Sequence, residues 1–274
     1  IPLRTETYSD DGTGNAPFPY NASQSTVEIR MLQPQRNEKN ASFLVVPSET
    51  ITYTYERNPV DPRISQSFVL ETDELGNVKK SATVIYPRIS RPVAPDDIPD
   101  KVWEEQGKMH ISYGENYYTG DITDANIHRL RVLYETKAYE ISGITQPLTW
   151  FFNKQNIIDK IAEINADHLK EILFEDEFDG TLQKRLSNHT RTYFMNDTLN
   201  GALGIGVLSS LGISYKSYGL AFTKNLAEKY YNSGGVTRVT AAMLTDAKYV
   251  HLEGDEHWWV QPGEAIYPVN AKSK

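Results

Sequence analysis

The densest group of chemically capable side chains lies near the C-terminal end of the sequence. His251 and His257 flank Glu253, Asp255 and Glu256 within seven residues. Imidazole and carboxylate groups are common zinc ligands and acid–base catalysts, so the His251–His257 cluster is a candidate centre for a metal-dependent hydrolase. None of the histidines, however, shows the H-x-x-x-H, H-E-x-x-H or H-x-H spacing, which places two imidazoles on one metal. A hairpin loop beside the following tryptophans is the simpler interpretation.

Two adjacent tryptophans, Trp258 and Trp259, follow this cluster. Neighbouring residues of a strand point to opposite faces. We therefore expect one indole to face a core and the other to face a second layer, a partner or a ligand. The alternative function is a carbohydrate- or receptor-binding β module that uses Trp258 and Trp259 on a groove, whereas packing between layers is the simpler interpretation.

Three other motifs are weaker indications of chemistry. The acidic segment Glu175–Asp179 has carboxylates for a metal but lacks EF-hand spacing, so a solvated turn is expected. The loop Gly204–Gly206 lacks the third glycine and the βαβ context of a dinucleotide-binding loop. Ser209 and Ser210 lie outside any G-x-S-x-G motif. The sequence therefore predicts no catalytic, cofactor-binding or metal-binding residue, and the chain is expected not to be an enzyme.

Composition excludes several classes of function. The 274 residues include no cysteine, and this removes disulfides, thiolate metal sites and cysteine nucleophiles. The net charge is −8 without a basic block, which argues against nucleic acid and anionic membrane surfaces as partners. No apolar run approaches the roughly 18 residues of a membrane helix, so direct membrane insertion is not expected. The chain begins Ile1-Pro2 without methionine, and we expect a piece of a longer protein.

Strands dominate the elements that would have to position these side chains. The meander at 51–86 shows the pattern most clearly: Tyr53 and Tyr55 alternate with threonines, and Ala82, Val84 and Tyr86 share one face of its last strand. Similar patterns predict strands at 4–8, 26–33, 43–46, 67–72, 109–118, 129–141, 249–252, 258–260 and 265–267. The segment 182–195 fits both a helix and a strand, and its threonine- and aromatic-rich end favours the strand. Loops are expected at 10–25, at the proline-rich 87–108 and at 202–211, and tight turns at 58–62 and 73–77.

Helices are expected in two places. Ile157, Ile161 and Ile164 recur at helical spacing after the N-cap residue Asn153, which predicts a helix over 154–165 followed by a short second piece. Two further short helices are expected at 223–231 and 240–247. The predicted fold class is mainly β, with large twisted antiparallel sheets, a helical insertion and short C-terminal helices. Three regions are predicted within one continuous unit. Residues 1–148 form a long-stranded β region with a surface loop at 87–108. Residues 149–200 hold the helical insertion and a following strand, and residues 201–274 hold a loop, short helices and closing strands.

Four stretches, in order along the chain, resemble one protein family. They are Ser48–Arg63 running into Asp73–Val78, Arg131–Gly143, Ser217–Thr223, and Tyr249–Trp259. Together they resemble the middle region of the B component of insecticidal Tc (toxin complex) toxins and of SpvB-like proteins, which are related to Rhs/YD-repeat shells. Two segments depart from the family: Pro87–Lys108 does not match closely, and 146–180 matches only in being helical and then turning.

The resemblance implies a structural role. In this family such a segment is part of a hollow β-sheet shell that encloses a toxic payload and joins a translocation channel. We therefore expect a non-catalytic shell segment of a secreted toxin component, without cofactor, whose partners are other parts of the parent chain and other toxin-complex subunits. Any toxic enzymatic domain is expected to lie outside this chain.

Overall fold

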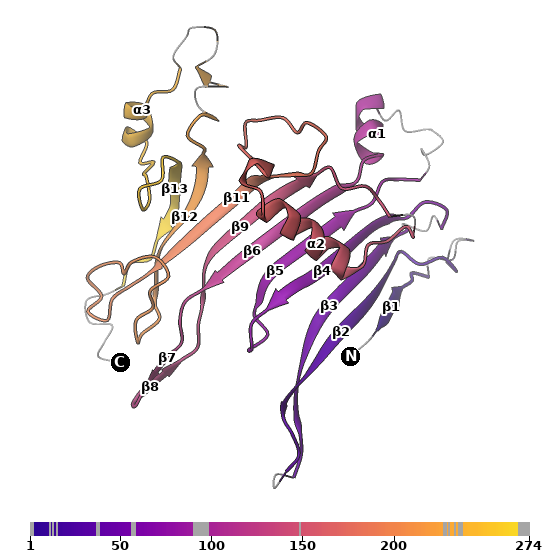
Figure 1. The fold of residues 1–274 in the computed structure, drawn as a ribbon, viewed down its shortest axis with the longest axis horizontal. Coiled ribbons are helices and arrows are strands. Elements are labelled where there is room, and N and C mark those ends of the chain that lie inside the picture. The colour runs from indigo at the N-terminus through magenta and orange to yellow at the C-terminus, as the bar shows by residue number, and fades with distance from the viewer. Residues whose placement is uncertain are drawn as a thin grey trace. The chain divides into compact units, whose positions relative to one another are not determined.

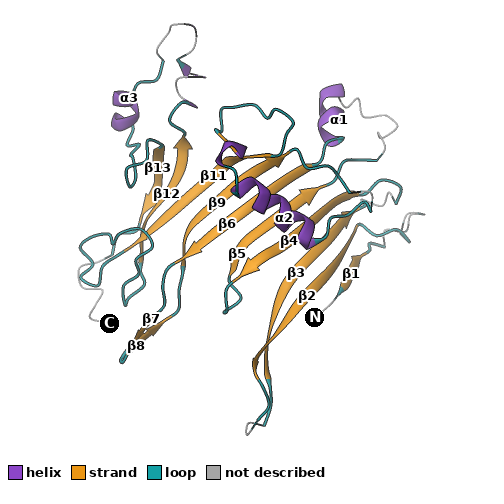
Figure 2. Ribbon diagram, viewed as in Figure 1, coloured by secondary structure: helices purple, strands orange, loops and turns teal. Residues whose placement is uncertain are grey.

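The computed structural model describes all residues except 1–2, 11, 13, 15, 37–38, 56–58, 90–98, 148, 227–228, 230, 233, 235–237 and 268–274. The fold is mainly β, with an antiparallel sheet of 11 strands and a second sheet of two, and the predicted fold class is confirmed (Figure 1, Figure 2). The helices are α1 (Asp100–Gln106), α2 (Lys154–Asn165), the 3₁₀ turn η1 (His168–Lys170) and α3 (Ala241–Asp246). None of the described helices is long and apolar enough to cross a membrane.

The strands divide between two compact units. Unit 1 comprises 1–113, 140–170 and 180–183, and unit 2 comprises 114–139, 171–179 and 184–274, so β6, β9 and β11 contribute residues to both. The strands are β1 (Arg4–Thr7), β2 (Asn21–Gln33), β3 (Ser42–Thr54), β4 (Arg63–Thr72), β5 (Val78–Ile85), β6 (His110–Tyr118), β7 (Ile122–Asp124), β8 (Ile127–Arg129), β9 (Leu133–Ser142), β10 (Glu171–Ile172), β11 (Gln183–Phe194), β12 (Ser214–Phe222) and β13 (Trp258–Glu264). The predicted regions 1–148, 149–200 and 201–274 remain a prediction.

In unit 1 the antiparallel strands β1 to β5 pair in sequence order. One face of the sheet carries Phe68, Val84 and Tyr86, which are almost fully buried, and α2 lies across this face (Figure 2). The helix begins where predicted, since the Asn153 side chain accepts from the first turn in a capping box. Its buried face is Ile157, Ile161 and Ile164, as the sequence spacing predicted.

A hydrogen-bonded bridge ties the segment before α2 to the same face. The buried Gln66 side chain donates to the Phe152 carbonyl at 2.8 Å, and the Phe152 N–H donates to the Tyr86 hydroxyl at 3.1 Å. Burial is the main cause that raises the pKa of Tyr86 to about 12. Tyr86 therefore acts as a neutral hydroxyl within the core: it donates to Gln66 Oε1 and accepts from the Phe152 N–H.

Unit 2 is built on the antiparallel strands β11, β12 and β13, with β10 joined in parallel to β11. The strand predicted at 182–195 is confirmed as β11. Its core includes Trp259, Tyr193 and Phe194. The helix α3 begins at its N-cap Thr240, which confirms the predicted helix there. The helix predicted at 223–231 falls partly outside the described residues.

Several predicted strand boundaries in the first half are wrong. The chain was expected to be a loop up to Ser25, but β2 begins at Asn21 because both β1 and β3 pair with that stretch. The strand expected to stop at Pro47 continues to Thr54. Pro47 lies at a register shift opposite Val27, and β4 pairs with β3 only from Glu49 onward, so the missing proline N–H costs no bond on the β4 side.

Other departures lie in the connections. Of the loop expected at 87–108, residues 90–98 lie outside the described residues, and α1 forms after Pro99 because Lys101, Glu104, Glu105 and Gln106 are good helix formers. The strand expected from Arg129 begins only at Leu133, and a small β7–β8 hairpin precedes it. The strand β12 was not predicted. The strands expected at 249–252 and 265–267 are absent, and there Val250 makes only an isolated bridge to Trp259.

Candidate functional site

The two tryptophans occupy different environments, as the alternation of a strand predicts. Trp259 is fully buried, and its indole Nε1 donates to both carboxylate oxygens of Asp255, at 3.0 and 3.1 Å. Trp258 is partly exposed and lies against the His251 ring, with ring centroids 4.0 Å apart. Because Trp259 has neither an exposed face nor a free N–H, the two indoles cannot form a shared sugar-stacking groove.

The acidic and imidazole groups of the His251–His257 cluster are directed to structural partners. Glu253 accepts from the Tyr193 hydroxyl at 2.5 Å, and Glu256 pairs with the Lys224 ammonium at 2.6 Å. His257 accepts from the Lys224 backbone N–H at 3.2 Å, and the His251 ring bonds the His257 carbonyl. Among the residues that the structure describes, no group of three histidine or carboxylate side chains is arranged to hold a metal ion.

A buried polar cluster in unit 2 connects β9, β11 and β13. We call Glu135, His189, Arg191 and Trp259 the unit 2 cluster. Glu135 Oε1 accepts from His189 Nε2 at 2.5 Å and from Arg191 Nε at 3.0 Å. The Arg191 guanidinium lies 4.7 Å from the centre of the Trp259 ring, and the His189 ring meets the same indole edge to face at 4.7 Å. These contacts join strands far apart in sequence through one carboxylate and one indole.

The protonation states in the unit 2 cluster follow from its contacts. Burial alone would raise the pKa of the Glu135 carboxyl, but the hydrogen bonds from His189 and Arg191 outweigh it and hold that pKa at about 2. Burial is also the main cause that lowers the pKa of His189. A neutral imidazole that donates from Nε2 to an ionised carboxylate satisfies both groups. The cluster thus clamps the strands together and holds no proton poised for transfer near neutral pH.

The remaining sequence candidates also have structural roles. Glu175, expected in a solvated acidic turn, is instead buried and accepts from the Thr223 hydroxyl at 2.6 Å. Ser209 is buried and donates to the Met195 carbonyl at 2.7 Å, so it is not an exposed nucleophile. Gly206 has a φ of +73°, and a Cβ there would lie 3.1 Å from the Tyr134 ring, which makes this loop a packing contact.

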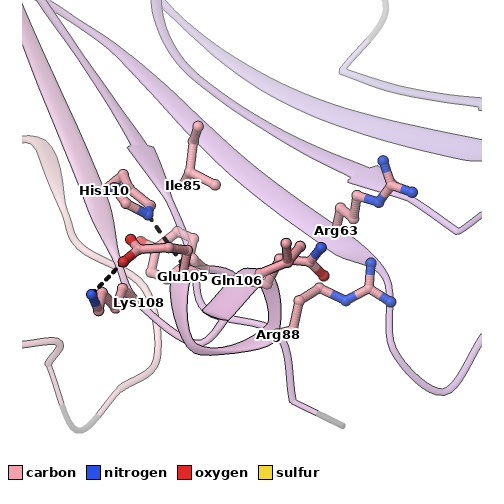
Figure 3. A pocket seen from close by; sticks show the side chains of 9 residues that line it. Arg63, Ile85, Arg88, Glu105, Gln106, Lys108 and His110 are labelled. Carbon is pink, nitrogen blue, oxygen red and sulfur yellow. Dashed lines mark hydrogen bonds and ion pairs between the residues drawn. The ribbon is translucent and has the colours of Figure 1, made fainter. Parts of the chain in front are cut away.

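A pocket in unit 1 of about 430 Å³ was not foreseen from the sequence (Figure 3). Arg63 and Arg88 lie on one side of it, and Glu105 and Lys108 lie across from them. Its acid is already paired, since Glu105 accepts from Lys108 Nζ at 2.6 Å. Arg88 is held by the buried carboxylate of Asp61, with Nε 2.8 Å from Oδ2. The pocket's charged groups are therefore mainly engaged in holding α1 and the end of β5.

The most extensive polar feature is a surface of hydroxyl groups on the sheet of unit 1, opposite the face that α2 covers. Register and alternation place on it Thr5, Thr7, Ser23, Ser25, Thr50, Thr52, Thr54, Ser65, Ser67, Ser81 and Thr83, from five adjacent strands. We call these residues the hydroxyl face. The same register also places Val69 and the half-exposed Ile85 among them. Some bond across strands, as Ser25 does to Thr50 at 2.9 Å and Ser67 to Thr83 at 3.3 Å. Charged residues join these rows at strand ends, such as Arg63.

Unit 2 repeats the same chemistry on a smaller scale. The Thr136 and Thr190 hydroxyls lie 2.6 Å apart, and those of Thr192 and Ser217 lie 3.2 Å apart. Along β11, Thr190 and Thr192 alternate with His189 and Arg191 of the unit 2 cluster, so the two threonines point to the other face of the strand. The sequence signal for both surfaces was present as serine and threonine at every second position. The same strands carry aromatic residues at the alternate positions, so this pattern by itself predicts a strand and not a polar surface.

Residues 2–130 match the model of a family described as the insecticide toxin TcdB middle/C-terminal region. No curated protein matches the chain. A crystal structure of TcdB2-TccC3-Cdc42 is similar with a TM-score of 0.66 and 20% identity, over 97% of this chain and 12% of that chain. For a crystal structure of TcdB2-TccC3 the TM-score is 0.67, with 19% identity over 97% of this chain and 13% of that one.

A variant of the Photorhabdus luminescens Tc holotoxin pore is also similar, with a TM-score of 0.63 and 21% identity over 94% of this chain and 12% of that chain. The chain therefore spans about an eighth of the length of these structures. The likeness in fold extends past residue 130, where the family match ends. The predicted resemblance is confirmed: residues 2–130 match the middle/C-terminal region of the insecticide toxin TcdB in sequence, and nearly the whole chain is similar in fold to the TcdB2-TccC3 structures.

Proposed function

We propose that this chain is a non-catalytic wall segment of a secreted toxin component, and that its hydroxyl face lines the space in which a toxic payload is enclosed. Its partners would be other parts of a longer polypeptide and other toxin-complex subunits. The similar structures are those of TcdB2 with TccC3 and of a Tc holotoxin pore, which supports a role within such an assembly.

The hydroxyl face is the observation that carries this proposal. A wall around an unfolded chain must be rigid, hydrated and weakly adhesive. Serine and threonine on paired strands meet these needs, since threonine favours the strand and its hydroxyl bonds to its cross-strand neighbour. Within the rows of the hydroxyl face the apolar side chains are the scattered Val69 and Ile85, and they do not form a large apolar patch that would hold a passing peptide.

The opposite side of unit 1 has the character of an outer surface. The helix α2 covers the apolar face of the sheet and presents charged residues, among them the exposed ion pair of Lys160 and Glu163 at 3.0 Å. Mixed charges of this kind favour solubility and contribute little to stability. The difference between the two sides of unit 1 is what an enclosing wall requires.

Substitutions in the longer protein that carries this chain separate the wall from its two rivals. We expect His251→Ala and Trp258→Ala to leave assembly and cell killing unchanged, because both side chains lie at the surface of unit 2. A hydrolase would lose killing with His251→Ala, and a glycan-binding module would lose cell binding with Trp258→Ala. Either loss, in an assembly that remains intact, would contradict the proposal.

Trp259→Ala is the matched comparison. It removes a fully buried indole that Asp255 and Arg191 both contact, and the loss of such a side chain costs about 3–5 kcal/mol. We expect this variant to unfold more readily and to assemble poorly. Normal assembly of Trp259→Ala would show that unit 2 does not depend on this core.

A further inference from the structure

The hairpin of β2 and β3 extends beyond its neighbours and forms an arm (Figure 1). The strand β1 pairs with β2 only as far as Gln24, and β4 pairs with β3 only from Glu49. Residues Val27–Gln33 and Ser42–Ser48 are therefore a two-stranded ribbon, which we call the arm. A ribbon of two strands is rarely stable by itself in water.

One side of the arm is fixed to the body of unit 1. Glu28 pairs with the Lys154 ammonium of α2 at 2.5 Å, and Arg30 donates to the Asp73 carbonyl at 3.1 Å. Val46, on the same side, is almost fully buried near the turn at Gly76, which also contacts Leu44. The arm is thus held in position by the β4–β5 turn and by α2, so its other side is presented in a defined geometry.

The other side of the arm is an apolar row. Cross-strand pairs place Ile29 beside Val45 and Met31 beside Phe43, next to Val27 and Pro47. The exposed fractions are 66% for Ile29, 61% for Met31, 56% for Phe43 and 40% for Val45. These directly opposed pairs bring the four side chains together on one face.

The apolar row continues the hydroxyl face but reverses its chemistry. On β2 the hydroxyl residues Ser23 and Ser25 precede Val27, Ile29 and Met31 on the same face. The change coincides with the register shift between Thr26 and Val27. Where the sheet is five strands wide the face carries mainly hydroxyl groups, and where only two strands remain it becomes apolar. An apolar surface of this kind is typical of a contact with another element.

The size of the row limits what can cover it. With a full side-chain area on the order of 200 Å² each, the four residues expose roughly 450 Å² in total. A stable interface between separate proteins buries about 800 Å² on each partner, so the row is too small for a pair of free copies. It is sufficient for an element tethered in the same polypeptide, because tethering supplies a high effective concentration.

We propose that the apolar row binds an apolar strand or sheet face from another part of the same, longer polypeptide. This inference rests on the proposed wall function, and the similar structures, in which this fold occupies only 12–13% of the chain, leave ample sequence for such an element. The fixed geometry of the arm lowers the ordering cost of this contact. The arm would thus close one seam of the wall.

A photo-crosslinking residue at Met31 in the longer protein tests the inference, with the same residue at Thr83 of the hydroxyl face as the matched control. We expect Met31 to give an intramolecular crosslink to a segment outside residues 1–274, identified by mass spectrometry, with a yield independent of protein concentration and at least tenfold above that at Thr83. A crosslink between two copies, a crosslink to the payload, or a yield equal to that at Thr83 would overturn it.

A second variant converts the row to the chemistry of the hydroxyl face, with Ile29→Thr, Met31→Thr, Phe43→Thr and Val45→Thr. Threonine keeps the strand propensity of the ribbon, so the arm is expected to remain folded. We expect this variant, with the crosslinker placed at Pro47, to lose at least nine-tenths of the crosslink that Pro47 gives in the unchanged row. An unchanged crosslink yield would overturn the inference about the arm. Enclosure of the payload is measured separately in the same variant, and it tests the wall proposal independently of the arm.

Discussion

Replacing Glu135 by glutamine tests whether the unit 2 cluster stabilises the fold through an ionised carboxylate. The substitution keeps the size of the side chain but removes the charge that accepts from both His189 and Arg191. In the folded chain the pKa of Glu135 is about 2, against an ordinary glutamate value of about 4.3. A depressed carboxyl pKa contributes stability that is present above the ordinary pKa and is lost as the pH falls toward the folded value.

The expected magnitude follows from this difference. A shift of about two pKa units, at about 1.4 kcal/mol each, corresponds to about 3 kcal/mol of unfolding free energy near pH 7. Urea unfolding of the 274-residue chain and of Glu135→Gln should therefore differ by about this amount near neutral pH. The difference should shrink steadily between about pH 4.5 and pH 2. His189 does not cancel in this comparison at acid pH, because Glu135 raises the pKa that burial of the imidazole lowers, and glutamine would not. The magnitude is therefore read above about pH 7, where the imidazole is neutral in both proteins.

Glu105→Gln serves as the control, because Glu105 pairs with Lys108 at an exposed position and solvent screens that pair. Its unfolding should follow the pH dependence of the unchanged chain. Equal unfolding free energies for Glu135→Gln and the unchanged chain near neutral pH, with parallel curves in acid, would refute the account of the unit 2 cluster.

Three further substitutions test individual contacts in unit 1 by urea unfolding near neutral pH. Arg88→Met should cost about 3 kcal/mol, because it leaves the buried Asp61 carboxylate without its cation; a loss below 1 kcal/mol would mean that water satisfies Asp61. Asn153→Ala should cost about 1 kcal/mol through loss of the α2 cap, and Asn153→Ser should restore most of it. Gly143→Ala should cost at least about 3 kcal/mol, since φ is +79° and its Cβ would lie 2.1 Å from the Thr181 carbonyl oxygen; near-normal stability would show that this turn relaxes.

Features encoded locally were predicted well from the sequence. The helix α2 was predicted with its correct ends because the cap Asn153 and the isoleucine spacing both lie within one short segment. The turn at Asp73–Asn77 likewise formed as predicted, with Asp73 accepting from the backbone of Leu75 and Asn77. The extent of β3 was misjudged because a proline is tolerated or excluded according to neighbouring strands, and these are known only once the sheet is assembled.

The candidate site was harder to predict, for a related reason. Glu135 and His189 are 54 residues apart, and only the pairing of the strands brings them into contact. The sequence directed attention to His251 and His257, which are close along the chain but face structural partners. Proximity in sequence is a poor guide to a site in a sheet protein, because strand pairing decides which side chains meet.

The access of reagents to the two sides of unit 1 tests the wall proposal most directly. The 274 residues contain no cysteine, so single cysteines can be introduced at Ser67 on the hydroxyl face and at Lys160 on α2, in an assembled longer protein whose other cysteines are replaced. We predict that a maleimide on a large polymer labels Lys160→Cys rapidly and Ser67→Cys at least tenfold more slowly, while denaturation makes both rates equal. Equal labelling of both positions in the intact assembly, or protection of Lys160→Cys instead, would contradict the account.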